Sequence, residues 1–362
     1  MVEGGAFDTL WATARDMDAT LRVAAKHAAS LAKKQVHAEP YSRGAMFQKM
    51  ARREIAVFRG VPILVKSHRS ATMQDALVHA LSHRFPPRET SRVQVGPSHA
   101  LKRLPVREIM RRWLGGRAIV GVTDLHIRGT RVEEVIDTRA LSDFNTLIRG
   151  SDHLSEQEMM TLVIASKGNV TDSHSDDPDG TNHCFFGKKL WLAWDAFEGM
   201  AAGLEDVERQ HVSGEQAAFD IRTFVGLRSS RWFLVSTGDT LYLPGNLTHK
   251  VLTLESYLGV GSFHIGLPGS LDTFTRWLHR GPLWSMDDRS KANAGLVDEA
   301  AIVTLRIADR VRSGSSKIRE RWGFDALRES YEVWKKSINR ATREEVLQHR
   351  SFRKLVEMAQ SA

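Results

Sequence analysis

The amino-acid sequence predicts an α+β protein in which a β-sandwich or β-barrel in the middle third is flanked by helical regions. The middle third consists of short apolar segments separated by Gly, Pro, Asn and Asp, a rhythm typical of antiparallel β structure. The charge is also unevenly distributed. Residues 1–150 hold 25 Lys and Arg against 14 Asp and Glu, whereas residues 151–285 hold 10 against 17. We therefore expect a mixed α/β region over 1–150, a β core over 151–285 and a helical region over 286–362.

Six segments of the predicted core combine apolar and β-branched residues with turn residues at their ends. They are Met159–Ser166, Cys184–Trp194, Arg231–Ser236, Asp239–Leu243, Lys250–Leu254 and Tyr257–Phe263. We expect each of them to form a strand.

The flanking regions contain apolar residues at helical spacing. We expect helices within residues 1–36, 72–84, 105–114, 296–311, 324–338 and 342–359, and a strand–turn–strand unit over residues 54–66, which Gly60 and Pro62 interrupt. Thr342 followed by Glu345 has the spacing of a capping box, which predicts that the last helix begins there.

The composition excludes several classes of protein. With 42% hydrophobic and 26% charged residues in 362, the chain is globular rather than disordered. It has no run of about 20 apolar residues and no secretory signal at its N-terminus. The single cysteine, Cys184, excludes a disulfide framework within the chain and fits a reducing compartment. We expect an intracellular protein, cytoplasmic or nuclear, without a membrane partner.

The basic residues concentrate in one stretch. Residues 43–117 hold 16 Lys and Arg against 4 acidic residues. This stretch can steer an acidic peptide or RNA toward a binding site, or it can be a solvated basic face of helices. Its few aromatic residues form no recognisable RNA-binding motif, so nucleic acid is the less favoured partner.

The most specific local feature of the sequence is His174 followed by Asp176 at the end of a predicted strand. Residues i and i+2 of an extended chain point to the same side, so that an imidazole and a carboxylate can face one metal ion. His249 begins another predicted strand 75 residues later, after a turn at Pro244 and Gly245. Two histidines and one carboxylate form the facial triad of non-haem Fe(II) sites, which leaves three coordination positions open.

A lysine pair gives a second indication of a buried ligand. Lys188 and Lys189 interrupt a strand that is apolar on both faces, and adjacent strand residues point to opposite sides. At least one ammonium is therefore expected to point inward, where a dicarboxylate ligand supplies the missing anion. The alternative is that both lysines extend to solvent from a sheet edge.

These motifs resemble those of the JmjC iron(II)/2-oxoglutarate-dependent oxygenases, in particular the asparaginyl hydroxylase branch of the hypoxia pathway. The resemblance rests on Gly-Asn-Val-Thr-x-x-His-x-Asp at 168–176, Gly-x-Lys at 187–189 and Gly-Asp-x-Leu-Tyr-x-Pro at 238–244 followed by His249. It covers about residues 159–266. It implies a double-stranded β-helix, the jelly-roll or cupin-like JmjC core, for the β region.

The resemblance also implies roles for individual residues. His174, Asp176 and His249 would bind iron, and Thr171 and Lys189 would bind the distal carboxylate of 2-oxoglutarate. Two positions depart from the family, and we expect His264 and Asn182 there to contact the co-substrate. His264 stands in place of an asparagine. Gly180 replaces another, with Asn182 close by.

Two further residues near the motifs are not expected to bind metal. His183 is expected at the start of a strand, and Cys184 is expected in the core.

The resemblance implies a hydroxylase that couples decarboxylation of 2-oxoglutarate to succinate with hydroxylation of a C–H bond. The substrate is a protein side chain or a small molecule. The open alternatives are an N-methyl demethylase or an RNA-modifying oxygenase of the same chemistry, and a non-catalytic JmjC-like binding module. The C-terminal helices, with Trp322 and Trp334, either form a homodimer interface or pack within the chain.

Overall fold

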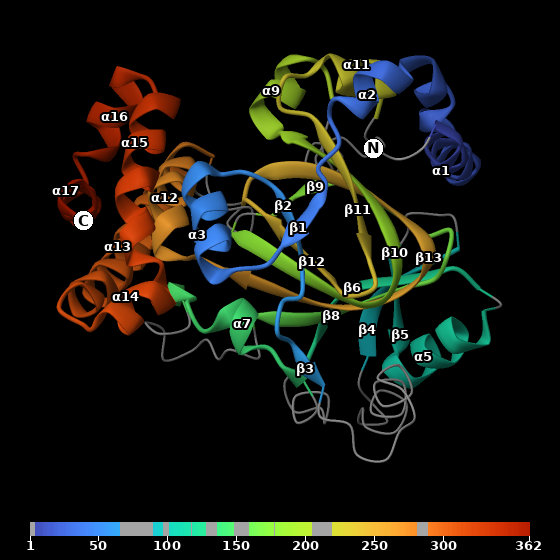
Figure 1. Ribbon diagram of the computed structural model, residues 1–362, viewed down its shortest axis with the longest axis horizontal. Helices are drawn as coiled ribbons and strands as arrows, with labels where there is room; N and C mark the ends of the chain where they lie inside the picture. Colours follow the sequence, from blue (N-terminus) through green and yellow to red (C-terminus); the bar gives the residue numbers. More distant parts are fainter. Residues whose placement is uncertain are drawn as a thin grey trace.

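The protein is a mixed α+β structure built on one large, mostly antiparallel sheet (Figure 1). The computed structural model describes residues 4–65, 90–96, 101–116, 118–127, 136–147, 159–176, 178–204, 219–280 and 289–362. Eleven strands of this described part form the sheet: β1 (Ala38–Pro40), β2 (Ala56–Arg59), β4 (Thr90–Val95), β5 (Leu101–Pro105), β6 (Val120–His126), β8 (Met160–Ala165), β9 (Val170–Ser175), β10 (Asp179–Asp195), β11 (Arg231–Ser236), β12 (Asp239–Leu243) and β13 (Leu247–His264). β3 (Leu64–Val65) and β7 (Ile136–Asp137) form a separate small pair.

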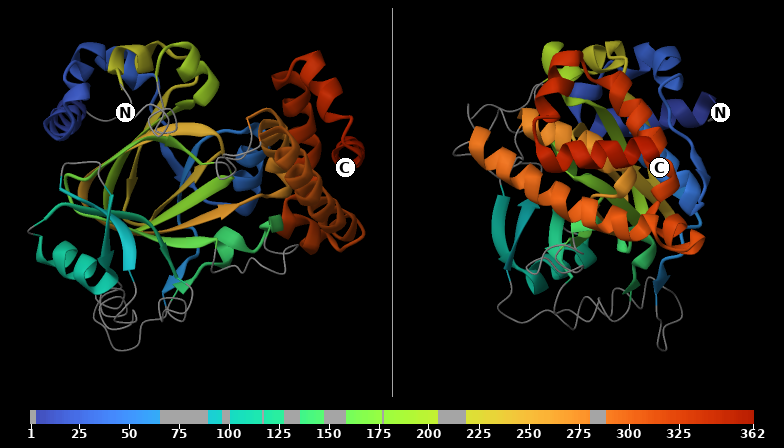
Figure 2. Two further views of the ribbon diagram at one scale, coloured as in Figure 1. Left: turned by 180° about the vertical axis from the view of Figure 1, so that it is seen from behind. Right: turned by 90° about the vertical axis from the view of Figure 1, so that its left-hand side faces the viewer.

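Helices surround the sheet in three groups (Figures 1 and 2). One group covers the outside of the sheet near the N-terminus: α1 (Gly4–Met17), η1 (Ala19–Leu21), η2 (Ala24–His27), α2 (Ala28–Ala32), α9 (Ala196–Ala201) and α11 (Ile221–Gly226). The second is a pair of separate helices at opposite ends of the other half, α5 (Val106–Gly115) and α7 (Arg139–Ser142). The third gathers at one end: α3 (Arg43–Arg52), α12 (Leu267–Arg280), α13 (Arg289–Arg312), α14 (Ser316–Trp322), η4 (Phe324–Ala326), α15 (Leu327–Ser337), α16 (Arg340–Val346) and α17 (Arg350–Ser361).

The long strands β10 and β13 organise the sheet. They pair antiparallel from Asp179 opposite His264 to Asp195 opposite Leu247. The first half of β10 also pairs with β12 and its second half with β11, whereas the first half of β13 pairs with β9 and its second half with β8. The ladder is irregular between Cys184 and Lys189, and such bulges bend strands. The sheet therefore bends into two halves that face each other.

Gly187 permits the close approach of chains at this bend. Its φ is 99°, and a Cβ atom placed there would lie 2.2 Å from the backbone oxygen of Ser256. Only glycine combines this backbone conformation with the space that is left.

The predicted strands of the core are confirmed, with two differences in extent. The segments Lys250–Leu254 and Tyr257–Phe263 belong to the single strand β13, and β10 begins five residues before Cys184. Polar residues such as Glu255 and Asn182 conceal this continuity in the sequence.

The end of the chain differs from the prediction. The segment 342–359 forms two helices, α16 and α17, instead of one. The predicted capping box is wrong, because the N-cap is Asn339, whose side chain accepts a hydrogen bond of 2.8 Å from the Thr342 amide. The amide side chain caps as well as a hydroxyl and acts three residues earlier. The helix predicted over 72–84 lies outside the described residues.

Apolar packing connects the helices to the sheet and to one another. Trp11 of α1 packs edge-on against Trp232 of β11, with ring centroids 5.4 Å apart. Trp334 of α15 is buried and donates its indole N–H to the Thr275 hydroxyl of α12 at 2.7 Å. The C-terminal helices thus pack within the chain, and dimerisation through them stays a prediction. No helix in the described part of the chain is long and apolar enough to span a bilayer.

Candidate metal centre

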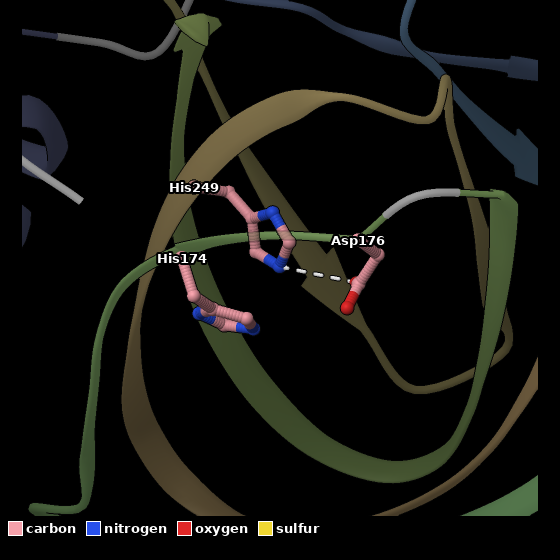
Figure 3. A group of neighbouring side chains, drawn as sticks. All are labelled: His174, Asp176 and His249. Carbon is pink, nitrogen blue, oxygen red and sulfur yellow. Dashed lines mark ion pairs between the residues drawn. The ribbon is translucent and has the colours of Figure 1, made fainter. Parts of the chain in front are cut away.

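Three predicted ligands converge at one edge of the space between the two halves of the sheet (Figure 3). His174 lies in β9, Asp176 is the first residue after that strand, and His249 lies opposite His174 in β13. One ligand atom from each lies within 4.8 Å of the others. The imidazole centroids are 4.2 Å apart, and His249 Nε2 is 3.8 Å from Asp176 Oδ2. This group can hold a metal ion.

Backbone hydrogen bonds determine which imidazole nitrogen each histidine offers. His174 Nδ1 lies 2.7 Å from the carbonyl oxygen of Asp172, and His249 Nδ1 lies 3.1 Å from that of Leu247. A carbonyl oxygen only accepts, so both Nδ1 atoms carry the hydrogen. In the neutral rings Nε2 then presents a lone pair, as in metal-bound histidines whose other nitrogen bonds to the protein.

The electrostatics of the metal-free site are unfavourable. Burial lowers the pKa of His249 well below its usual range, and the nearby His174 lowers it further. Burial also raises the pKa of Asp176, an effect that His174 opposes. Lone pairs and a carboxylate therefore face one another, with His249 buried and the Asp176 side chain about one-third exposed. A divalent cation reverses these costs, because it is attracted to all three groups.

A β-bulge brings Thr171 to the same side as the metal ligands. Thr171 lies opposite Val251 and His174 lies opposite His249, so β9 has one more residue than β13 between these pairs. The extra residue changes the alternation of side chains. Thr171 and His174, three positions apart, consequently both line the cavity.

A backbone hydrogen bond from Asn246, a residue in an uncommon conformation, holds the main chain at Asp176 in place. The amide of Asn246 donates a 2.7 Å hydrogen bond to the Asp176 carbonyl oxygen. Asn246 is buried and has a φ of 63°, a region in which asparagine is one of the few tolerated residues besides glycine. The turn before β13 thereby fixes the distance between the segments that carry Asp176 and His249.

The metal ligands border a cavity of about 220 Å³ between the facing halves of the sheet. Its walls are partly apolar, with Val163, Trp191, Leu241, Leu243 and Val251. Of the predicted site residues, the cavity brings together Thr171, His174, Asp176, Asn182, Lys189 and His249.

Lys189 contributes a buried positive charge to this cavity. It is 2% exposed, and within the described residues no carboxylate lies within ion-pair distance of its ammonium. Its Nζ lies 4.5 Å from the ring centroid of Tyr257, a cation–π contact. Burial lowers the pKa of Lys189 to about 8, although the nearby Cys184 opposes this change. Lys188, by contrast, is partly exposed and pairs with Glu255 at 2.8 Å. The expectation that one ammonium points inward is confirmed.

Tyr257 connects Lys189 with Asn182 and was not identified from the sequence. Its hydroxyl donates a 2.5 Å hydrogen bond to Asn182 Oδ1, while its ring lies beneath the Lys189 ammonium. Gly259 leaves room for this ring, since a Cβ atom there would lie 2.7 Å from it. The alternation of Tyr257, Gly259 and Gly261 on one face of β13 was the available sequence signal.

The structure does not bring His264 to the cavity. It is the last residue of β13 and lies opposite Asp179 in the β10–β13 ladder. Its ring packs against Phe144 and Tyr242, with ring centroids 4.9 and 6.3 Å away. The adjacent Phe263 lines the cavity, so the alternation of the strand directs His264 to the opposite face. Neither of its ring nitrogens has a hydrogen-bond partner among the described residues.

His183 and Cys184, which are adjacent in β10, are both buried. His183 Nδ1 lies 2.8 Å from the Thr240 hydroxyl. Cys184 packs in the core, as predicted. Neither belongs to the metal-binding group found in the described residues.

The donor set restricts the chemistry of the centre. Two imidazole nitrogens and one carboxylate oxygen suit Fe(II), and also Zn(II) sites that keep an open position. The buried ammonium in the same cavity adds a site for an anionic group. Searches of protein-family models and of curated proteins found no match to this chain.

Proposed function

We propose that this protein is an iron(II)/2-oxoglutarate-dependent dioxygenase that hydroxylates a C–H bond. The proposal rests on one juxtaposition: a His-Asp-His group that can hold a metal ion shares a cavity with a buried ammonium that has no carboxylate partner among the described residues. A hydrolytic zinc site needs no such cation. A keto diacid that chelates the metal at one end requires a positive group at its other end.

The arrangement of the strands supports the finer fold proposed here, a double-stranded β-helix. β10 and β13 change partners midway, so that four-stranded and larger layers face each other around the cavity. A jelly-roll places its ligands in this way, between two sheets and near one open end.

His174, Asp176 and His249 would hold the iron through Nε2 atoms and a carboxylate oxygen. When bound, iron and 2-oxoglutarate together activate oxygen, and the keto acid is converted to succinate. Lys189 would bind the distal carboxylate, with the Thr171 hydroxyl beside it. On the β10–β13 ladder Lys189 lies opposite Thr253, four residue pairs away from the pair that His249 forms with Ala193. At about 3.3 Å per residue this separation is roughly 13 Å. A lysine side chain and a short diacid together match this separation.

The cavity walls would protect the reaction from water. Trp191 stacks on His249, with ring centroids 5.3 Å apart and an interplanar angle of 29°. Apolar walls of this kind strengthen electrostatic interactions with a bound anion. They also keep the C–H bond of the substrate near the metal in place of solvent.

Three alternatives remain as different outcomes of one assay. An N-methyl substrate releases formaldehyde in addition to succinate, and an RNA-modifying oxygenase is stimulated by RNA. A non-catalytic module binds the diacid without forming succinate. The intact triad favours catalysis over the last of these, because a module that only binds the diacid does not need all three metal ligands.

The test measures succinate formed from 2-oxoglutarate by the full chain with Fe(II), oxygen, ascorbate and mixed peptide or RNA substrates. We expect iron-dependent succinate formation that Lys189→Met abolishes and that the matched surface variant Lys188→Met retains. Equal activity of the two lysine variants, or tight Fe(II) binding without any affinity for 2-oxoglutarate, would contradict the proposal.

A further inference from the structure

An ion triad outside the cavity connects the N-terminal segment with the metal centre. Lys250 lies between His249 and Val251 in β13, and both of these neighbours line the cavity. The alternation of the strand directs Lys250 to the opposite face, where it is 4% exposed. Its Nζ lies 3.0 Å from Asp172 Oδ1 and 3.0 Å from Asp18 Oδ2. One buried ammonium thus connects two carboxylates that are distant in sequence.

Each carboxylate is attached to a defined local structure. Asp18 follows α1 and caps η1, with its Oδ1 accepting hydrogen bonds from the Thr20 amide at 2.9 Å and the Thr20 hydroxyl at 2.7 Å. Asp172 lies in the bulge of β9, between Thr171 and His174. The ion triad therefore joins the end of the first helix to the bulge next to the metal ligands.

The bulge matters because its backbone orients His174. The carbonyl oxygen of Asp172 accepts the Nδ1 hydrogen of His174 at 2.7 Å, while the carboxylate of the same residue binds Lys250. If the carboxylate is released, the carbonyl is free to move. The His174 ring then loses the hydrogen bond that fixes its rotation and its tautomer.

We infer that Lys250 and Asp18 are positioning residues for the metal centre, so that the N-terminal segment forms part of the metal site although it provides no ligand. This inference rests on the proposed metal centre. Buried ion groups contribute little net stability, because the desolvation of three charges offsets their attraction. A role in geometry accounts for the arrangement better than a role in stability, since apolar residues at all three positions would pack without these costs.

The test compares Lys250→Met and Asp18→Asn with the surface control Lys188→Met. Each metal-free full-length protein is titrated with Co(II), whose visible absorption reports the coordination of the ion, and its melting temperature is measured without metal. We expect Co(II) dissociation constants about 10- to 100-fold higher for Lys250→Met and Asp18→Asn, the range seen when partners of metal-binding histidines are removed. Lys188→Met should bind as the wild type does.

Several results would overturn the inference. Co(II) affinity within twofold of wild type in both variants assigns the triad to stability alone, whatever happens to the melting temperature. If Lys250→Met does not fold, Asp18→Asn decides, because it is nearly isosteric and removes the charge of the second carboxylate that holds Lys250 in place. Failure of the wild-type protein to bind Co(II) would remove the metal centre itself and with it the proposed function. Unchanged affinity of the variants leaves that function intact.

Discussion

Replacing Lys189 by Met tests whether the buried ammonium serves a ligand or the fold. Methionine retains the length and apolar stem of the side chain and removes its charge. Because burial lowers the pKa of Lys189 from 10.5 to about 8, holding the ammonium in the ligand-free protein costs about 3 kcal/mol at pH 7. We expect Lys189→Met to be more stable than wild type by about this amount at pH 7.

The pH dependence of this difference has a defined sign. Between about pH 8 and 10.5 the unfolded chain retains the lysine proton that the folded chain has lost, so the Lys189 contribution to wild-type stability rises with pH. The advantage of Lys189→Met should therefore be constant below pH 8 and disappear by about pH 10.5. Cys184 acts in the opposite direction, since burial raises its pKa to about 12. Comparing variant with wild type removes most of that contribution.

Binding of 2-oxoglutarate should change in the opposite sense to stability. Loss of a charged hydrogen bond of about 1.5–3 kcal/mol weakens binding by about 10- to 150-fold. The measurements are urea unfolding between pH 6 and 10.5 and calorimetric titration of the Mn(II)-loaded protein with 2-oxoglutarate, with Lys188→Met as control. A less stable Lys189→Met protein, or one that binds the diacid within twofold of wild type, refutes the reasoning.

Three further substitutions have defined outcomes. Asp176→Ala removes a metal ligand and should weaken Co(II) binding by more than 100-fold, which exceeds the effect of removing residues that only support ligands. A smaller loss of Co(II) affinity, measured by visible absorption, would contradict the assignment of Asp176 as a ligand. His264→Phe should leave the stability unchanged at pH 7 and raise it by about 3 kcal/mol at pH 4. Burial lowers the pKa of this histidine to about 4, so its protonation favours the unfolded chain between pH 6.5 and 4. An equal loss of stability in acid for variant and wild type would rule this out. Gly259→Ala forces a methyl group against the backbone oxygen of His183 and the ring of Tyr257. It should destabilise the protein by about 1–3 kcal/mol and disturb Asn182. An unchanged melting temperature would mean that both the strand and the ring adjust without cost.

The sequence indicated the metal centre because its signal is local. His174 and Asp176 are two residues apart near the end of a strand, and His249 follows a turn that Pro244 and Gly245 mark. Side chains in a β-strand alternate between its two faces, so the sequence predicts which face such residues occupy over short distances. Strands β11 and β12 also have the predicted bounds, since turn residues lie on both sides of each.

The remainder of the site depends on features that the sequence does not mark. The placement of Thr171 depends on a bulge in β9, and one extra residue reverses the face of every side chain beyond it. The expectation for His264 rests on its distance from a family motif, whereas its neighbour Phe263 occupies the inner face. The contact between Asp18 and Lys250 joins positions 232 residues apart. Such contacts are visible only after the tertiary structure is known.

The two ends of the cavity predict that metal and diacid bind cooperatively. One end presents the Asp176 carboxylate and two imidazole lone pairs, which attract a cation, and the other presents the Lys189 ammonium, which attracts an anion. Either ligand alone leaves the opposite charge unsatisfied in a partly apolar cavity, whereas a metal chelated by a keto diacid satisfies both.

We expect a coupling of about 1–3 kcal/mol, so that Mn(II) should tighten 2-oxoglutarate binding by about 5- to 150-fold. By linkage 2-oxoglutarate must tighten Mn(II) binding by the same factor, which paired calorimetric titrations measure. Succinate, which retains the distal carboxylate but lacks the keto group, should show less coupling. Independent binding of metal and diacid would mean that His249 and Lys189 serve two separate ligands.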